Sequence, residues 1–302
     1  MISRRSFVGL AAGAFAAAYG AGCSAFATAA DASRAGKGRF LFGACRPVSD
    51  AQVLKEVGYD FIEQGVAKLL MPNMPDAEYA AKVLPASMKC ALPIRSCNGF
   101  IPWEMKITGP KDKLQWEAAL KFADVAFRRA DELGIKYIVL GSSGARKAPD
   151  GFSKDECRDQ FVEFCKRLAD AMEKGNRRVV VVLEPLRAAE CNMFNFVGQG
   201  IDFVDRIGSP HVQLLADIYH MCSGNEQPEV LGRAGKRLLH CHVATRAHRM
   251  APGLEEDDLS PYLQALAATG YRGGVSIEGG WKGKEFRDAA ASALDLLRKW
   301  ST

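Results

Sequence analysis

The sequence lacks the features that mark dinucleotide-binding and nucleic-acid-binding proteins. No glycine-rich phosphate fingerprint follows the first strand-like segment, so a dinucleotide fold has no support. Only five histidines are present and the formal net charge is +5. A multi-zinc nuclease would need more metal ligands and more phosphate contacts than these, so we expect no nucleic-acid partner.

The chain also lacks internal boundaries. No Pro/Gly/Ser-rich linker or block of charge interrupts residues 31–302, which are therefore predicted to form one domain. Hydrophobic residues make up 48% of the sequence and charged residues 25%, an ordinary globular composition with enough apolar material for a large core. None of the nine cysteines forms a C-x-x-C pair, and the eight that follow Cys23 are interpreted as buried thiols, with disulfide pairing in the periplasm as the alternative.

The first thirty residues differ from the rest. The motif SRRSF at residues 3–7 precedes a short Ala/Gly-rich apolar stretch and small residues at 25–29, which predicts a twin-arginine-type signal peptide over residues 1–30 and a periplasmic location. The stretch is short for a membrane span, so we expect none after cleavage; an uncleaved anchor and acylation at Cys23 are the alternatives. Loss of two arginines with the signal peptide lowers the formal charge from +5 to +3. A net charge of this size is too small to suggest an anionic membrane partner.

Strand-like and helix-like segments alternate through the remaining chain. Residues 113–133, for example, carry Leu114, Ala118, Phe122 and Ala126 at helical spacing before Gly134. Eight such units predict a closed parallel (β/α)8 TIM barrel rather than an open sheet. The predicted strands are residues 40–45, 59–64, 92–97, 137–142, 179–184, 212–217, 238–243 and 274–279.

Each of the last four predicted strands carries a metal-binding side chain at its end. Strand ends of a barrel meet at one mouth, so these side chains should converge. Buried carboxylates beside an imidazole need a cation to neutralise them, which predicts a metal site. An oxygen-rich set favours Mn²⁺, with Mg²⁺ or Co²⁺ as alternatives, over structural zinc. The four residues are Glu184, Asp217, His242 and Glu278.

Such a site suits proton transfer next to a carbonyl. A divalent cation can hold vicinal carbonyl and hydroxyl oxygens and stabilise an enediolate. Glu184 and Glu278 flank the set and are the candidates for a catalytic pair that acts on the two faces of the substrate. His240 points the same way as His242, and we expect it to support the site rather than to bind the ion. Further residues that could line the mouth are Glu63, Cys97, Asn98 and Phe100 and, as aromatics that could stack on a substrate's apolar face, Trp103 and Trp281.

The segments LEPLRAAE, DIYHM, HCHVATRAHRMAPG and VSIEGGW resemble the sugar isomerase/epimerase group of xylose isomerase-like TIM barrels, especially the ketose 3-epimerases of the D-tagatose 3-epimerase type. The resemblance covers essentially the whole chain after the signal. It implies that the same four residues bind the metal and that Glu184 and Glu278 also form the acid/base pair. It further implies substrate contacts by Glu190, His220 and Arg249.

The chain departs from that family between His242 and Arg249. The family commonly has an acid and an Asn where this chain has residues 245–248, and Arg249 aligns only if one residue is inserted. The sugar is therefore left open. The expected function is a metal-dependent epimerase or isomerase of a keto sugar, and the alternatives are a periplasmic 3-keto-glycoside lyase or hydratase using the same site and a sugar-binding protein with a vestigial site. A homo-oligomer is an open expectation.

Overall fold

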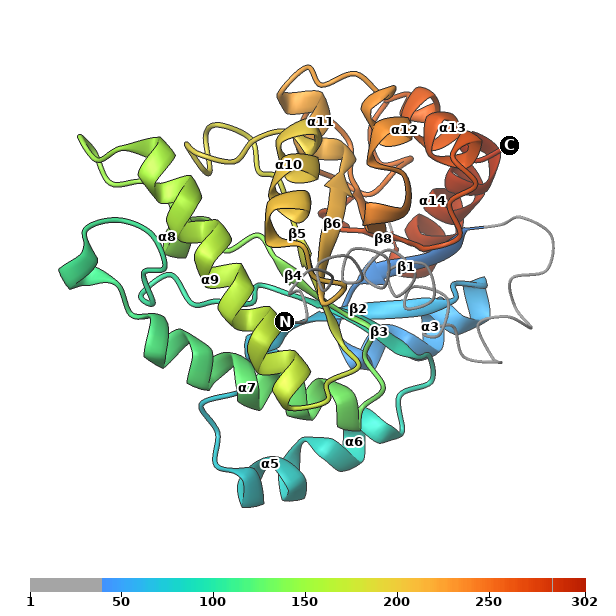
Figure 1. Cartoon of the computed structure of the whole chain (residues 1–302). Helices are drawn as coiled ribbons and strands as arrows, with labels where there is room; N and C mark the ends of the chain where they lie inside the picture. Colours follow the sequence, from blue (N-terminus) through green and yellow to red (C-terminus); the bar gives the residue numbers. More distant parts are fainter. Residues whose placement is uncertain (1–39, 284) are drawn as a thin grey trace, which may run out of the picture. The chain divides into compact units, whose positions relative to one another are not determined.

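Eight parallel strands close into a barrel in the computed structural model, which describes residues 40–283 and 285–302 (Figure 1). Strands pair in chain order, and the last pairs with the first. This confirms the predicted (β/α)8 fold and every predicted strand to within a few residues. The strands are β1 Leu41–Cys45, β2 Phe61–Gly65, β3 Ile94–Asn98, β4 Tyr137–Leu140, β5 Val180–Leu183, β6 Val212–Asp217, β7 Leu238–Val243 and β8 Gly274–Ile277.

The strands are apolar because both of their faces are covered. In β5, Val180 and Val182 pack with Val139 and Leu215 in a small cluster of their own, whereas Val181 and Leu183 belong to the large core that includes residues of the surrounding helices. Since successive side chains of a strand point to opposite faces, the small cluster lies inside the barrel and the large one lies between strands and helices.

Helices pack around the barrel (Figure 1). The buried face of α7 includes Ala119, Phe122, Ala126 and Ala130, whereas the expected Ala118 is exposed. The predicted helix is confirmed, but at its first turn the buried residue is Ala119 and not the predicted Ala118. The helices are α3 Ala51–Val57, α4 Val66–Leu69, α5 Asp76–Lys82, α6 Leu84–Met88, α7 Trp116–Glu132, α8 Ser143–Arg146, α9 Lys154–Lys174, α10 Val197–Ile207, α11 Ile218–Ser223, α12 Val230–Ala234, α13 Ser260–Ala268 and α14 Phe286–Trp300, with 3-10 turns at Val48–Asp50, Lys111–Lys113 and Gly235–Arg237.

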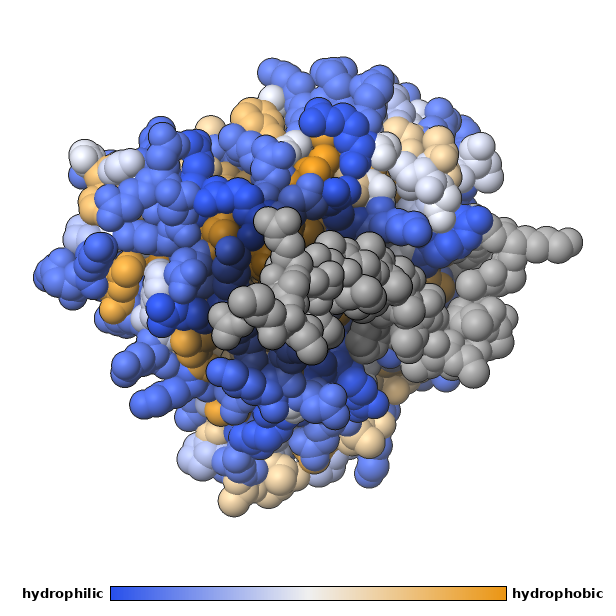
Figure 2. Space-filling model, viewed as in Figure 1, coloured by the Kyte–Doolittle hydropathy of each residue, from blue (hydrophilic) through white to orange (hydrophobic). Residues whose placement is uncertain are grey.

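The surface of the described residues is mainly hydrophilic on the face that Figure 2 shows, with hydrophobic residues in small separate patches. The eight cysteines in this part of the chain are free thiols, as expected, but only five are buried, whereas Cys45, Cys90 and Cys222 are partly exposed. Among the described helices, none has the length and apolarity to cross a membrane. The predicted signal peptide and Cys23 lie outside the described residues.

Candidate active site

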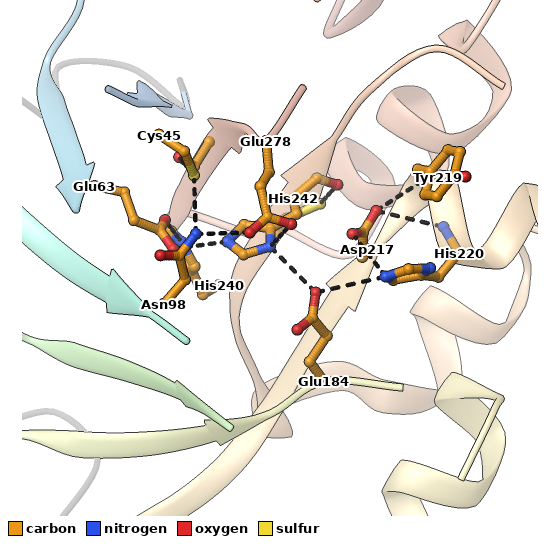
Figure 3. Close-up of polar contacts among 12 residues, drawn as sticks. Cys45, Glu63, Asn98, Glu184, Asp217, Tyr219, His220, His240, His242 and Glu278 are labelled. Atoms are coloured by element: carbon orange, nitrogen blue, oxygen red, sulfur yellow. Dashed lines mark hydrogen bonds and ion pairs between the residues drawn. The ribbon is translucent and has the colours of Figure 1, made fainter. Parts of the chain in front are cut away.

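Four side chains from neighbouring strands converge at one end of the barrel (Figure 3). One ligand atom from each of Glu184, Asp217, His242 and Glu278 lies within 4.8 Å of the others. Glu184 and Glu278 directly follow β5 and β8, Asp217 ends β6, and His242 lies in β7. The predicted convergence is therefore confirmed, and we call these four residues the strand-end cluster.

Asp217 joins the strand-end cluster to the start of a helix. Its Oδ1 accepts hydrogen bonds from the backbone N–H groups of Tyr219, at 2.8 Å, and His220, at 3.4 Å, and so caps α11. Its Oδ2 lies 3.5 Å from Nε2 of His220 and 3.4 Å from the guanidinium of Arg249. One oxygen is thus used by the fold and the other faces the site.

His242 presents a different nitrogen to each side. Its Nδ1 lies 3.4 Å from Glu184 Oε1 and 3.4 Å from Glu278 Oε2, and its Nε2 lies 2.9 Å from Glu63 Oε1. Burial alone would lower the pKa of His242, but Glu63 and Glu278 outweigh burial and raise this pKa well above its ordinary value. Because Nδ1 faces Glu184 and Glu278 whereas Nε2 faces Glu63, Nδ1 is the atom that a metal ion in the strand-end cluster would use.

The three carboxyls of the strand-end cluster have unequal surroundings. Burial raises the pKa of Glu184 and that of Asp217. Burial acts in the same direction on Glu278, but His242 and Arg249 outweigh it and lower the pKa of Glu278 to about 2. Three largely buried carboxyls and an imidazole nitrogen at this spacing fit a divalent cation that prefers oxygen ligands.

Arg249 and Glu190, whose implied contacts with substrate remain a prediction, lie beside the strand-end cluster. Arg249 donates from one terminal nitrogen to Oε2 of Glu278, and its other terminal nitrogen lies 3.8 Å from Oε1 of Glu190. Glu190 also accepts a hydrogen bond of 2.7 Å from Nε of Arg187. The backbone of Arg249 has a φ of 54°, a left-handed conformation that costs energy for a residue other than glycine.

His220 directs a donor at the strand-end cluster. Its Nδ1 accepts the backbone N–H of Arg187 at 3.3 Å, so the proton of the neutral ring is on Nε2. That Nε2 lies 3.9 Å from Glu184 Oε1 and has no hydrogen-bond partner among the described residues. Burial lowers the pKa of His220, which favours the neutral ring. Nε2–H is therefore placed to donate to an oxygen of a bound ligand.

The expected aromatic residues lie in contrasting surroundings. Trp103 is 67% exposed and contacts the amine of Lys106, 5.5 Å from its ring centre. Trp281 is 9% exposed, belongs to the edge of the large hydrophobic core and packs edge-on against Phe286, with ring centroids 5.3 Å apart. Their contact with a sugar remains a prediction. Cys97 and Phe100 were expected at the mouth, which is wrong, because both are buried in the hydrophobic core.

Asn98 and Cys45 extend the site towards β1, β2 and β3. The Asn98 side chain donates from Nδ2 to Oε1 of Glu278 at 2.6 Å and also lies 3.8 Å from Sγ of Cys45. Both residues line a cavity of about 310 Å³ together with Glu63, Gln64 and the segment 65–68. Cys45 was not among the predicted site residues, although it is the last residue of β1, the same strand-end position that identified the metal-binding candidates.

Comparison with known proteins agrees with this fold. A family model described as a xylose isomerase-like TIM barrel matches residues 51–300. The chain is 28% identical over 255 residues to an L-ribulose 3-epimerase of Methylomonas sp. (strain DH-1), covering 82% of this chain and 80% of that protein. It is 27% identical over 262 residues to the 3-dehydro-D-guloside 4-epimerase of Escherichia coli K12, and this match covers 81% of this chain and 91% of that protein. A D-psicose 3-epimerase of Enterocloster bolteae is 32% identical over 151 residues, 46% of this chain and 49% of that protein.

Solved structures give the same architecture. The apo form of the 3-keto-D-glucoside 4-epimerase from E. coli superposes with a TM-score of 0.72 at 22% identity and covers 86% of this chain and 100% of that one. The D-psicose 3-epimerase from Clostridium cellulolyticum H10 with D-tagatose superposes with a TM-score of 0.73 at 19% identity and covers 87% of this chain and 99% of that one. At these identities the likeness establishes the fold only.

Proposed function

This chain belongs to the xylose isomerase-like TIM barrel family, and on that premise we propose that it is a divalent-metal-dependent epimerase or isomerase of keto sugars. Its relatives that match over most of the chain are sugar epimerases, which supports an enzyme of the isomerase or epimerase class. The proposal depends mainly on one observation, the convergence of Glu184, Asp217, His242 and Glu278 within 4.8 Å at the ends of adjacent strands.

The strand-end cluster would hold the cation through three carboxylates and Nδ1 of His242. The oxygen-rich ligand set favours Mn²⁺, with Mg²⁺ or Co²⁺ as alternatives. When bound, such a cation would polarise a carbonyl oxygen and stabilise negative charge on the neighbouring oxygens of the substrate.

Glu278 and Glu184 would move the proton. Arg249 and Asn98 each donate to the Glu278 carboxylate, which holds it in place and ionised, as a base needs to be. Glu184, the carboxyl on the other flank of the strand-end cluster, would return a proton to the opposite face. Removal of a proton on one face of the carbon and its return on the other face inverts the configuration, which is an epimerisation.

The remaining polar groups would orient the sugar. Nε2–H of His220 faces the strand-end cluster and would donate to a substrate oxygen, with Arg249 and Glu190 holding neighbouring hydroxyl groups. The cavity beside Asn98 would accept the part of the sugar that does not react. Trp103 and Trp281 complete the proposed binding set as stacking surfaces.

Deuterium exchange tests this function directly. The protein is incubated in D₂O with Mn²⁺ and, in parallel, with D-tagatose, D-allulose, L-ribulose and 3-keto glycosides, and the products are followed by NMR. We expect deuterium next to the carbonyl of at least one sugar together with its epimer. Glu278→Gln should abolish the exchange and largely keep Mn²⁺ bound. Glu226→Gln is the control: this carboxyl accepts the backbone N–H groups at the start of α10, and its replacement should leave the exchange intact.

Two results would contradict the proposal. Exchange that persists at full rate in Glu278→Gln would remove the assigned base, and full activity after metal removal would exclude the metal requirement. Release of an aglycone from a 3-keto glycoside without epimer would instead indicate the lyase, which has no support among the relatives.

We also propose that the chain is exported to the periplasm by the twin-arginine route. The support is the SRRSF motif and the apolar stretch after it. Replacing Arg4 and Arg5 with Lys should leave the protein in the cytoplasm of a bacterial host, as measured by cell fractionation. Periplasmic recovery of that variant at the wild-type level would contradict this route.

A further inference from the structure

We propose that Glu63 is a positioning residue that selects Nδ1 of His242 as the metal-binding nitrogen and holds the ring in the orientation that binding requires. The inference rests on the proposed metal site and concerns a residue behind that site, on the opposite side of the imidazole (Figure 3). Glu63 lies in β2, whereas His242 lies in β7, so the contact crosses the barrel interior.

Glu63 receives three side-chain donors although it is completely buried. Its Oε1 lies 2.9 Å from Nε2 of His242, and its Oε2 lies 2.8 Å from Nε2 of His240 and accepts a 2.8 Å hydrogen bond from Oγ of Ser96. Glu63, Ser96, His240 and His242 are all 0% exposed. A buried carboxylate is stable only when its oxygens are satisfied, and these three donors satisfy both oxygens.

The chemistry of a carboxylate determines the state of each imidazole. An ionised carboxylate can only accept hydrogen bonds, so Nε2 of His242 must carry a proton. In the neutral ring Nδ1 then has the lone pair, and Nδ1 is the nitrogen that lies 3.4 Å from both Glu184 and Glu278. The bond from Glu63 therefore leaves free the one nitrogen that faces the other metal-binding groups.

His240 keeps Glu63 in place. Its ring stacks on Tyr137, with centroids 5.7 Å apart and an interplanar angle of 30°, and also contacts the Phe61 ring at 6.0 Å. This packing fixes the donor that holds Oε2, so that Oε1 stays directed at His242. His240 thus acts on the site through Glu63.

The same geometry argues against a second metal ion. Cys45, Glu63 and His242 also bring ligand atoms within 4.8 Å of one another. An ion there would have to displace the donor on Oε1 of Glu63 and use His242 through Nε2 while the strand-end cluster uses Nδ1. A neutral imidazole has only one lone pair to offer, so it cannot bind both ions. We therefore expect one metal ion per chain.

The test is the substitution Glu63→Gln, which keeps the size of the side chain but replaces one acceptor oxygen by an NH₂ donor. The two imidazoles and Ser96 then cannot all donate to it, and the His242 ring should rotate or move its proton to Nδ1. We expect the Mn²⁺ dissociation constant, measured by titration calorimetry, to rise about 10–100-fold. Glu226→Gln is the matched control and should leave the constant unchanged.

A spectroscopic measurement separates positioning from a loss of stability. In the Mg²⁺-loaded wild-type protein with ¹⁵N-labelled histidine, we expect His242 to carry its proton on Nε2; with only five histidines, the spectrum can be assigned by single substitutions. In Glu63→Gln that signal should be lost or shift to protonated Nδ1. The wild-type spectrum gives an answer even if the variant does not fold.

Three outcomes would overturn the inference. The first is an Mn²⁺ dissociation constant for Glu63→Gln within twofold of the wild-type value. The second is a wild-type spectrum in which Nδ1 of His242 is protonated in the loaded protein. The third is binding of two Mn²⁺ per chain, one of which Glu63→Gln removes. If wild type binds no Mn²⁺ at all, the metal proposal itself fails and this inference fails with it.

Discussion

Asn98 donates a hydrogen bond from Nδ2 to Oε1 of Glu278 over 2.6 Å, and this bond joins the end of β3 to the end of β8 across the barrel mouth. Arg249 donates to the other oxygen of the same carboxylate. Glu278 is thus held at both oxygens, by a neutral donor on one side and a charged donor on the other, which leaves its carboxylate little freedom to turn.

We predict that Asn98→Ala lowers kcat about 10–100-fold, because a hydrogen bond to a charged group contributes about 1.5–3 kcal/mol. Mn²⁺ affinity should change less than in Glu63→Gln, since Arg249 still holds the other oxygen of Glu278. Steady-state kinetics with the best sugar and titration calorimetry measure the two effects. Asn98→Asp, which brings a second carboxyl to Glu278, should be worse than Asn98→Ala; equal kcat values for wild type and both variants would exclude a role for Asn98.

Metal removal should destabilise the protein. Three carboxyls within 4.8 Å repel one another without a cation, and a ligand at 100 times its dissociation constant stabilises the folded state by about 2.7 kcal/mol. For a chain of this size we expect Mn²⁺ to raise Tm by about 4–5 °C over the chelated protein, measured by scanning calorimetry. Asp217→Asn should keep the α11 cap but lose most of this shift. An equal shift in Asp217→Asn would mean that Mn²⁺ binds elsewhere.

Mn²⁺ binding should strengthen as pH rises. Burial raises the pKa of Glu184 and Asp217, so in the metal-free protein these carboxyls keep protons to a higher pH than ordinary carboxyls do. The cation needs them ionised, so its binding releases protons and is opposed at low pH. Glu278, with a pKa of about 2, is already ionised and should release none. Calorimetry at mildly acidic pH in two buffers of different ionisation enthalpy measures the release; identical heats in both buffers would contradict it.

Much of the fold and of the strand-end cluster could be predicted from the sequence because both follow from short-range patterns. Strands covered on two faces are continuous apolar runs, as in β5, and the barrel brings the residues that end such runs to one mouth. Glu184, Asp217 and Glu278 were found in this way, and the structure brings them together with His242.

The supporting contacts could not be predicted, because they depend on three-dimensional pairing. Glu63 and His242 are 179 positions apart, and Asn98 and Glu278 are 180 apart, so no local pattern connects them. Cys97 and Asn98 are neighbours in β3, yet only Asn98 faces the site while Cys97 is in the core. An error of one position in the assigned face of a strand therefore exchanges a site residue for a core residue.

Arg249→Met should separate substrate binding from metal binding. The guanidinium of Arg249 contacts Glu278, Asp217 and Glu190. Because it is positively charged, it would repel a bound metal ion, and its removal takes that charge away from the strand-end cluster. We expect Mn²⁺ affinity to stay equal or increase, while kcat/KM falls about 10–100-fold through loss of charged hydrogen bonds. Arg246→Met is the matched control, because Arg246 lies three positions earlier, pairs with Asp257 and should be silent in both measurements. Weaker Mn²⁺ binding in Arg249→Met, with KM unchanged, would mean that Arg249 organises the metal ligands rather than the sugar.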